Sequence, residues 1–80
     1  MPVPVLLFAS YADAFGGRQV LAPASAPCRV DELVAALRTL PGGERLPQRP
    51  LVAVNHSWAV PETLVQEHDE VALIPPVAGG

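Results

Sequence analysis

The residue best placed to do chemistry within the body of this chain is its single cysteine, Cys28. It stands between Pro27 and Arg29, just ahead of an apolar-periodic segment, where a helix dipole and a guanidinium could both lower the pKa of a thiol. A nucleophilic cysteine normally works with a positioned histidine, and none stands near it in the sequence. We therefore expect an inert thiol, with a reactive Cys28 as the alternative.

The histidines and the carboxylates around them form no recognisable site. His56 and His68 have no partner at metal-ligand spacing, so we interpret both as surface residues. Glu67, Asp69 and Glu70 are typical of a solvated acidic turn rather than of a general acid/base pair. No glycine-rich phosphate-binding loop is present either. The sequence thus predicts no active site, bound cofactor or metal ion.

The remaining chemical group is the carboxyl terminus, in the stretch VALIPPVAGG. Without side chains, Gly79 and Gly80 could enter a narrow tunnel and adopt backbone angles that other residues avoid. Pro75 and Pro76 restrict their own φ angles and disfavour helix in the residue before them, which predicts a flexible, extended arm over residues 75–80. A frayed end without function is the alternative, because terminal residues are often disordered.

The apolar pattern predicts one main helix and four strands to position that arm. A stripe at helical spacing over residues 30–40 predicts the helix, although Arg29 is a poor N-cap residue. A short helical turn is expected over residues 10–17. Strands are predicted over residues 3–9, 18–25, 51–55 and 71–74.

This order of elements predicts an α+β fold with a mixed sheet. A right-handed crossover through the helix would return the last strand beside the first, so both would lie inside the sheet. The helix would then cover one face, which is the ubiquitin-like β-grasp architecture. We expect one such domain over residues 1–80.

Alternation along the strands divides the apolar residues between the two faces of that sheet. Those expected to face the helix are Val5, Leu7, Val71 and Leu73. Leu6, Phe8 and Ile74 would point to the opposite face, and Trp58, in a turn, would lie over the same side. An open apolar patch on a small protein is typical of an interaction site. We predict partner binding through Phe8, Trp58, Ile74, Pro75 and Pro76, with shielding by the chain's own loops as the alternative.

Composition argues against several classes of partner. The 80 residues carry a formal net charge of −3, with five arginines and no lysine, so no basic patch is available for nucleic acid. No apolar run approaches the roughly 20 residues of a membrane span, and the amino terminus lacks the pattern of a signal peptide. A single cysteine is typical of a protein from a reducing compartment. We expect a cytoplasmic protein that contacts neither nucleic acid nor membrane.

Four segments, VLLFA, VDELVAAL, LVAVNHSWAV and HDEVALIPPVAGG, resemble in this order the small subunit of molybdopterin synthase, a ubiquitin-like sulfur-carrier family. The terminal DEVALIPPVAGG is the most specific of them. The resemblance implies that Gly80, with Gly79 before it, is adenylated by an ATP-dependent activating enzyme and converted to a thiocarboxylate. The large synthase subunit would then use that sulfur to build the dithiolene of molybdopterin from its cyclic pyranopterin precursor.

The resemblance also implies how the chain works with other proteins. It would be the non-catalytic small subunit of a sulfurtransferase, in a heterotetramer of two small and two large subunits. ATP would be used by the activating enzyme, and no cofactor would be bound by this chain. Since adenylation supplies a good leaving group inside a partner's pocket, the carrier needs a tail and a docking surface but no general base.

The sequence departs from the pattern of this family at two places, and three other functions are alternatives to the one that the resemblance implies. His68 stands where the family commonly has glycine, in a position suited to a left-handed turn. Relatives commonly carry basic residues after the first strand, whereas this chain has SYADAF, which counts against charge-based docking at that segment. The alternatives are a sulfur carrier for thiamine thiazole or another thiolation pathway, a ubiquitin-like protein modifier, and an interaction domain with an inert tail.

Overall fold

The computed structural model describes residues 2–76, so Gly79 and Gly80 lie outside the described residues. The main strands and helices follow one another along the chain in an order close to the one predicted. The elements are β1 (Val3–Leu7), α1 (Ala9–Phe15), β2 (Gln19–Ala22), β3 (Cys28–Arg29), α2 (Val30–Leu37), the short 3-10 helix η1 (Gly43–Arg45), β4 (Leu51–Val54), β5 (Ser57–Trp58), β6 (Leu64–Val65) and β7 (Val71–Ile74). No helix among the described residues is long and apolar enough to cross a bilayer.

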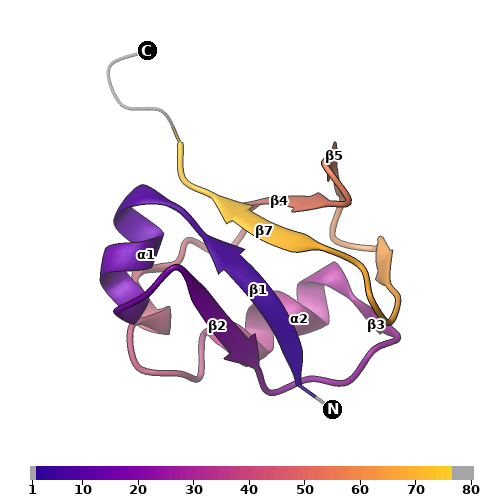
Figure 1. The fold of residues 1–80 in the computed structure, drawn as a ribbon, viewed down its shortest axis with the longest axis horizontal. Helices are drawn as coiled ribbons and strands as arrows, with labels where there is room; N and C mark the ends of the chain where they lie inside the picture. Colours follow the sequence, from indigo (N-terminus) through magenta and orange to yellow (C-terminus); the bar gives the residue numbers. More distant parts are fainter. Residues whose placement is uncertain (1, 77–80) are drawn as a thin grey trace.

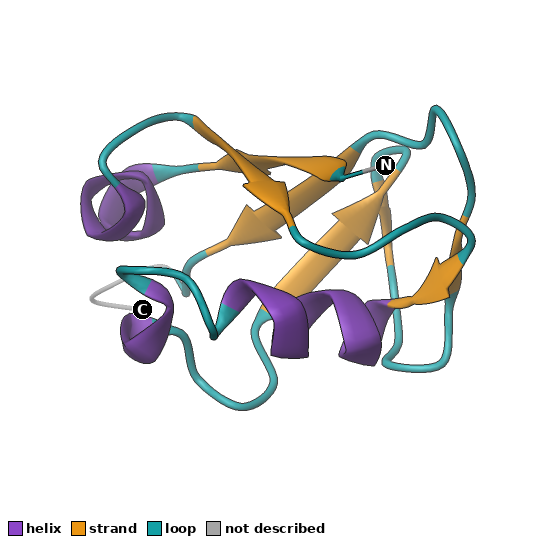
Figure 2. Cartoon of the chain, turned by 90° about the horizontal axis from the view of Figure 1, so that it is seen from below, coloured by secondary structure: helices purple, strands orange, loops and turns teal. Residues whose placement is uncertain are grey.

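Five strands form one mixed sheet in the order β2-β1-β7-β4-β5 (Figure 1). β1 is antiparallel to β2 and parallel to β7, while β4 is antiparallel to both β7 and β5. The first and last strands are therefore internal, as predicted. With α2 packed along one face, this confirms the ubiquitin-like β-grasp fold (Figure 2).

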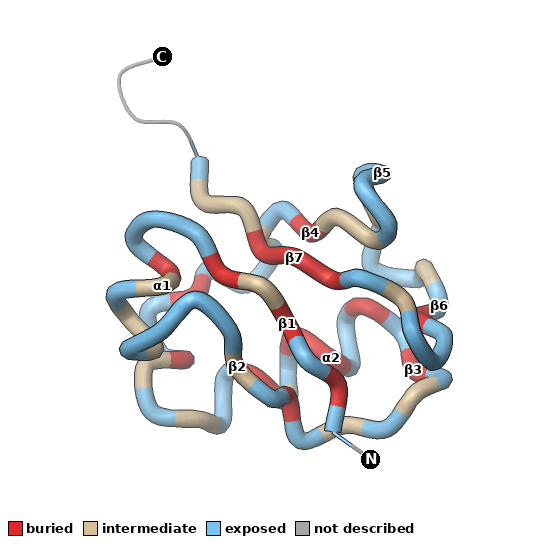
Figure 3. Tube along the Cα trace, viewed as in Figure 1, coloured by how far each residue is buried: buried red, intermediate tan, exposed pale blue. Residues whose placement is uncertain are grey.

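The core lies between α2 and the face of the sheet that it covers. α2 buries its predicted stripe of Val30, Leu33, Val34 and Leu37. The strand residues expected to face it, Val5, Leu7, Val71 and Leu73, are at most 2% exposed. Removing each such side chain from water contributes roughly 1.5–3 kcal/mol to the free energy of folding. Figure 3 shows the resulting buried segments in the middle of β1 and β7.

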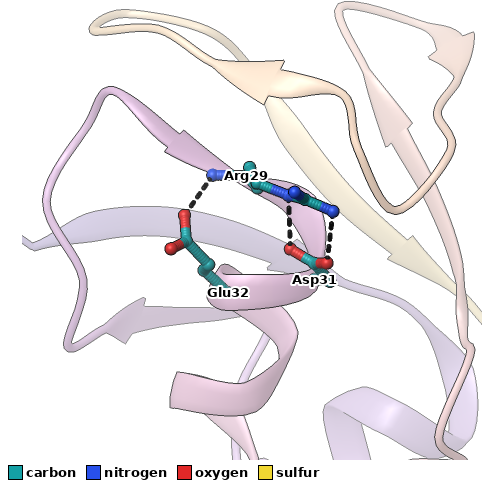
Figure 4. Close-up of polar contacts among 3 residues, drawn as sticks. All are labelled: Arg29, Asp31 and Glu32. Atoms are coloured by element: carbon teal, nitrogen blue, oxygen red, sulfur yellow. Dashed lines mark hydrogen bonds and ion pairs between the residues drawn. The ribbon is translucent and has the colours of Figure 1, made fainter.

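The start of α2 is capped better than its sequence predicts. The backbone N–H of Arg29 donates to Glu32 Oε1 at 2.8 Å, and the Arg29 guanidinium forms a 2.8 Å ion pair with Asp31 (Figure 4). The N–H groups of Val30 and Asp31 donate to the carbonyl oxygens of Thr63 and Pro61. These donors would otherwise be unsatisfied in a first helical turn. The backbone carbonyl groups of Pro61 and Thr63 therefore accept hydrogen bonds from the first turn of α2, as an N-cap side chain does in other helices.

Two close approaches hold the end of α2 against α1. A Cβ added at Gly43 would overlap the carbonyl oxygen of Leu37 and lie 2.7 Å from the Cα of Arg38. One added at Gly42, which has a φ of +94°, would overlap the carbonyl oxygen of Ala14. The PGG stretch thus ends the helix and also lets the backbone of η1 pack between the two helices.

Several predicted boundaries were wrong, and three strands were missed. The second strand covers only residues 19–22 of the expected 18–25, and α2 ends at Leu37 rather than at residue 40. Trp58 belongs to β5 and not to a turn. β3 and β6 pair with each other as a separate two-stranded sheet. Each missed strand has only two residues, which is too short for an alternating pattern to show in the sequence.

Candidate functional site

The site begins where the chain leaves the sheet at the end of β7. Ile74 is the last residue of β7 and pairs with Leu51 of β4. On the other side, Leu73 pairs with Leu7 of β1, which places Phe8 beside Ile74. Pro75 and Pro76 follow directly and are only partly covered. The arm therefore starts between two exposed apolar side chains, since Phe8 and Leu51 are 48% and 50% exposed.

The sheet face opposite α2 carries a continuous set of apolar residues. The strand registers place on this open face Pro4, Leu6, Phe8, Gln19, Leu21, Leu51, Ala53, Trp58, Ala72 and Ile74. Leu21 is 57% exposed and Trp58 is 69% exposed. No helix among residues 2–76 lies over this face (Figure 2). Phe8, Ile74, Pro75 and Pro76 are brought together where the arm leaves the sheet, whereas Trp58 lies on the same face but in the edge strand β5, level with Ala53 and Ala72 and away from the start of the arm.

The chain's own loops do not shield Phe8 or Trp58, so the alternative of a covered patch does not hold for them. Ile74 is half-buried between its neighbours. Sequence reasoning missed Leu21 and Leu51, although strand alternation puts Leu51 on the same face as Ala53. The sequence alone does not show which face of β4 packs against α2, so it does not show whether Leu51 is buried or exposed. The binding role of these residues stays a prediction.

Cys28 lies in β3, paired with Val65, and only 8% of it is exposed. Burial raises the pKa of its thiol, and the nearby Glu32 carboxylate raises it further. The shift is opposite to the one that would make a reactive thiolate at neutral pH. The expectation of an inert structural cysteine agrees with this environment.

A set of polar contacts ties the turn after β4 to the start of β7. Asn55 donates its backbone N–H to the Glu70 carbonyl at 2.8 Å and accepts the Glu70 N–H on Oδ1 at 2.9 Å. Its Nδ2 group donates to Asp69 Oδ1 at 3.0 Å. His56 Nε2 lies 2.9 Å from Glu70 Oε2, with 82% of the histidine side chain exposed. The acidic turn is thus solvated, as expected, but it also has a structural role.

Three residues of this region, Asn55, His56 and His68, have a positive φ, which is uncommon for residues other than glycine. His68 has a φ of +71°, which confirms the left-handed position predicted from the sequence. Asn55 has a φ of +52°, in the same region of backbone space. The pKa of Asp69 is lowered because the Gln66 N–H and the Asn55 side chain both donate to its carboxylate. Hydrogen bonds to the ionised form therefore hold this tight connection together.

An open hollow of about 830 Å³ lies on the helix side, between α2 and residues 59–62. Its walls include Val34 and Val52, with arginines and carboxylates among the other lining residues. No histidine, cysteine, serine, threonine or tyrosine lines it, so it holds no nucleophile paired with a base. Residues 2–76 also contain no group of three side chains that could hold a metal ion.

Several solved structures share the fold of this chain. SAMP1 from Haloferax volcanii is 26% identical, with a TM-score of 0.80 over 100% of both chains. A chain in the complex of subunits 1 and 2 of molybdopterin-converting factor from Helicobacter pylori is 25% identical, with a TM-score of 0.69 over 100% of both chains. A Pyrococcus furiosus protein, provisionally named molybdopterin converting factor subunit 1, has the same fold at 19% identity, with a TM-score of 0.77 over 96% of this chain and 99% of that one.

No curated protein matches the sequence. The model of the ThiS family matches residues 5–80, which is nearly the whole chain. That match, SAMP1 and the Helicobacter pylori chain agree with the resemblance to ubiquitin-like sulfur carriers that was drawn from the sequence. The chain belongs to the ThiS family of ubiquitin-like sulfur carriers.

Proposed function

We propose that this protein is the sulfur-carrying small subunit of molybdopterin synthase. The observation that carries the proposal is the position of the arm, which leaves β7 at the margin of an uncovered apolar face. The similarity to a chain in the solved complex of subunits 1 and 2 of a molybdopterin-converting factor supports a large-subunit partner. The Pro-Pro step and terminal glycines of DEVALIPPVAGG support the pathway.

The chemistry proceeds in two displacements at the carboxyl group of Gly80. An oxygen of the carboxylate attacks the α-phosphorus of ATP in the activating enzyme, and pyrophosphate leaves. A sulfur nucleophile at the oxidation level of sulfide then attacks the acyl carbon, and AMP leaves with its bonding electron pair. The product is a thiocarboxylate, formed without net oxidation or reduction. The large subunit receives this sulfur for dithiolene formation on the cyclic pyranopterin precursor.

This division of labour assigns a simple role to each part of the chain. Phe8, Trp58 and Ile74 dock the sheet on a partner, while Pro75 and Pro76 direct Gly79 and Gly80 into its active site. ATP is bound by the activating enzyme, and this chain binds no cofactor itself. The working assembly is a cytoplasmic heterotetramer of two small and two large subunits. A partner supplies every catalytic group except the carrier's own carboxyl terminus.

A second candidate function is protein modification through Gly80. It is favoured by the similarity to SAMP1, which has been described as a small archaeal modifier protein. Both functions start from the same activated carboxyl terminus, so the fold does not separate them. They differ in the acceptor, which is sulfur in the first case and an amine of another protein in the second.

Mass spectrometry of the protein from its native host tests the carrier function. A fraction of the chain should carry one sulfur in place of one oxygen, whereas a modifier should appear joined to other proteins. With purified partners, deleting Gly80 or adding one residue after it should leave folding intact and abolish thiocarboxylate formation and sulfur transfer. Full molybdopterin synthesis by the extended variant would contradict the proposal.

A further inference from the structure

The charged side chains, all of which belong to residues 2–76, are divided along the direction of β1 and β7. These parallel strands both end where the arm begins. α2 starts at the opposite end, beside β3 and β6, and its last turn meets η1, which in turn contacts α1. The direction of the strands therefore separates an arm end from a far end, on the left and right of Figure 1.

The arm end is positively charged although the whole protein is acidic. It holds four of the five arginines and two carboxylates, namely Arg18, Arg38, Arg45, Arg49, Asp13 and Glu44. The far end holds the other arginine, which is ion-paired with Asp31. Its carboxylates are Asp31, Glu32, Glu62, Glu67, Asp69 and Glu70. The net charge of −3 thus combines a positive end with a strongly negative one.

Two of the arginines flank the root of the arm from opposite sides. The Arg18 carbonyl accepts the N–H of Leu7, so Arg18 lies beside the end of β1. Arg49 lies two residues before Leu51, which pairs with the last residue of β7. Both arginines are exposed, and neither guanidinium group forms a hydrogen bond or ion pair with another of the described residues. Their charges are therefore available to a partner.

The same two arginines are also close to the exposed apolar residues at the arm root, and Arg49 in addition lines the hollow on the helix side. Arg18 adjoins the strand that leads to Phe8, and Arg49 is two residues from Leu51. This combination of an apolar centre with a charged margin is usual in protein interfaces. Basic residues are absent from SYADAF, so the positive charge here comes from Arg18, just before β2, and from Arg49, in the loop before β4.

We propose that the arm end docks on a partner surface that is apolar at its centre and acidic at its margin, around the opening that receives the arm. This rests on the proposed function, in which the large synthase subunit is that partner. Its carboxylates would attract Arg18 and Arg49 and repel the acidic far end. The charges would turn the carrier during approach, so that the arm reaches the opening first.

The test is the association rate with the purified large subunit, measured by stopped flow at about 0.02 M and about 0.5 M salt. We expect the wild-type rate to fall as salt increases. Arg18→Gln and Arg49→Gln should each slow association about threefold at low salt, and the double variant about tenfold. At high salt the rates of all four proteins should converge, because the charges are then screened.

Gln66→Glu is the matched control, because it lowers the net charge by one at the exposed far end. It should leave the low-salt association rate within about twofold of wild type, since rate effects of steering depend on where the charge lies. Equal slowing by this control would show that only net charge matters and would overturn the proposal. So would a double variant that associates as fast as wild type, or a wild-type rate that rises with salt.

Failure of this proposal can be told apart from failure of the proposed function. If the wild-type chain binds the large subunit and transfers sulfur while the arginine variants associate normally, the charge proposal alone is wrong. If the wild-type chain neither binds nor transfers sulfur, the proposed function is wrong, and the docking proposal fails with it.

Discussion

At the scale of single residues, Cys28 shows how the structure decides between two interpretations of one sequence position. The sequence places the thiol where a helix dipole and an arginine could activate it. In the structure, the Arg29 guanidinium is engaged by Asp31, and burial together with Glu32 raises the thiol pKa. The electrostatic environment of Cys28 therefore disfavours the thiolate that a sulfur relay would need.

We predict that Cys28→Ser and Cys28→Ala leave the rate of sulfur transfer from the carboxyl terminus within about twofold of wild type. The serine variant should lose about 1–2 kcal/mol of unfolding free energy, because its hydroxyl would be buried beside apolar neighbours. Urea denaturation and a reconstituted transfer assay measure the two quantities separately. A large loss of transfer in both variants at unchanged stability would show that the thiol takes part.

At the scale of elements, the close approach of η1 to the end of α2 leaves no room for a side chain at Gly43. We predict that Gly43→Ala lowers the free energy of unfolding by about 1–3 kcal/mol, because the new methyl group would displace backbone atoms. Gly17→Ala is the control, since its nearest neighbour would be the Gln19 carbonyl oxygen at 3.8 Å. The control should change stability by less than about 0.5 kcal/mol. Equal stabilities of the two variants in urea denaturation would contradict this account.

The elements also show how far sequence reasoning extends. Strands β1, β4 and β7 and helix α2 were predictable, because each buries a recognisable face and therefore carries a periodic pattern. β3, β5 and β6 were not predictable, since two-residue strands depend on their partners rather than on a pattern of their own. The start of α2 at residue 30 was predicted correctly, but the partners of its first N–H groups were not, because they are the carbonyl groups of Pro61 and Thr63, far away in sequence.

The candidate site was predictable to a similar extent. Alternation correctly put Phe8 and Ile74 on the open face, and the absence of a second covering helix followed from the element order. The chemistry of Gly80 came from the family resemblance alone, because a terminal glycine has no side chain whose type could indicate a reaction. The division of charge between the two ends needed the fold, since its arginines are spread from Arg18 to Arg49 in the sequence.

At the scale of the whole molecule, the open face should determine affinity for the large subunit. We predict that Phe8→Asp and Trp58→Asp each weaken binding at least about tenfold, because aromatic residues near the centre of an interface can contribute on the order of 2 kcal/mol or more. Both side chains are about half or more exposed, so both variants should fold. Val60→Asp is the control, because Val60 is 59% exposed but lines the hollow beside α2 instead.

Titration calorimetry on the folded variants measures these affinities. Binding of Val60→Asp should stay within about twofold of wild type. If both aromatic variants bind as tightly as wild type, the docking surface lies elsewhere. If Val60→Asp weakens binding as much as the aromatic variants do, the effect is not specific to the open face, and the prediction also fails.

The central position of β7 also has a mechanical consequence. Any pull that a partner exerts on the arm acts along the axis of β7, whose hydrogen bonds to β1 and β4 run across that direction. To extract the strand, such a force must shear both ladders at once instead of opening one bond at a time from an edge. Asn55 anchors the opposite end of the strand through the paired hydrogen bonds to Glu70. A force applied to the end of β7 along the strand should therefore leave the sheet intact.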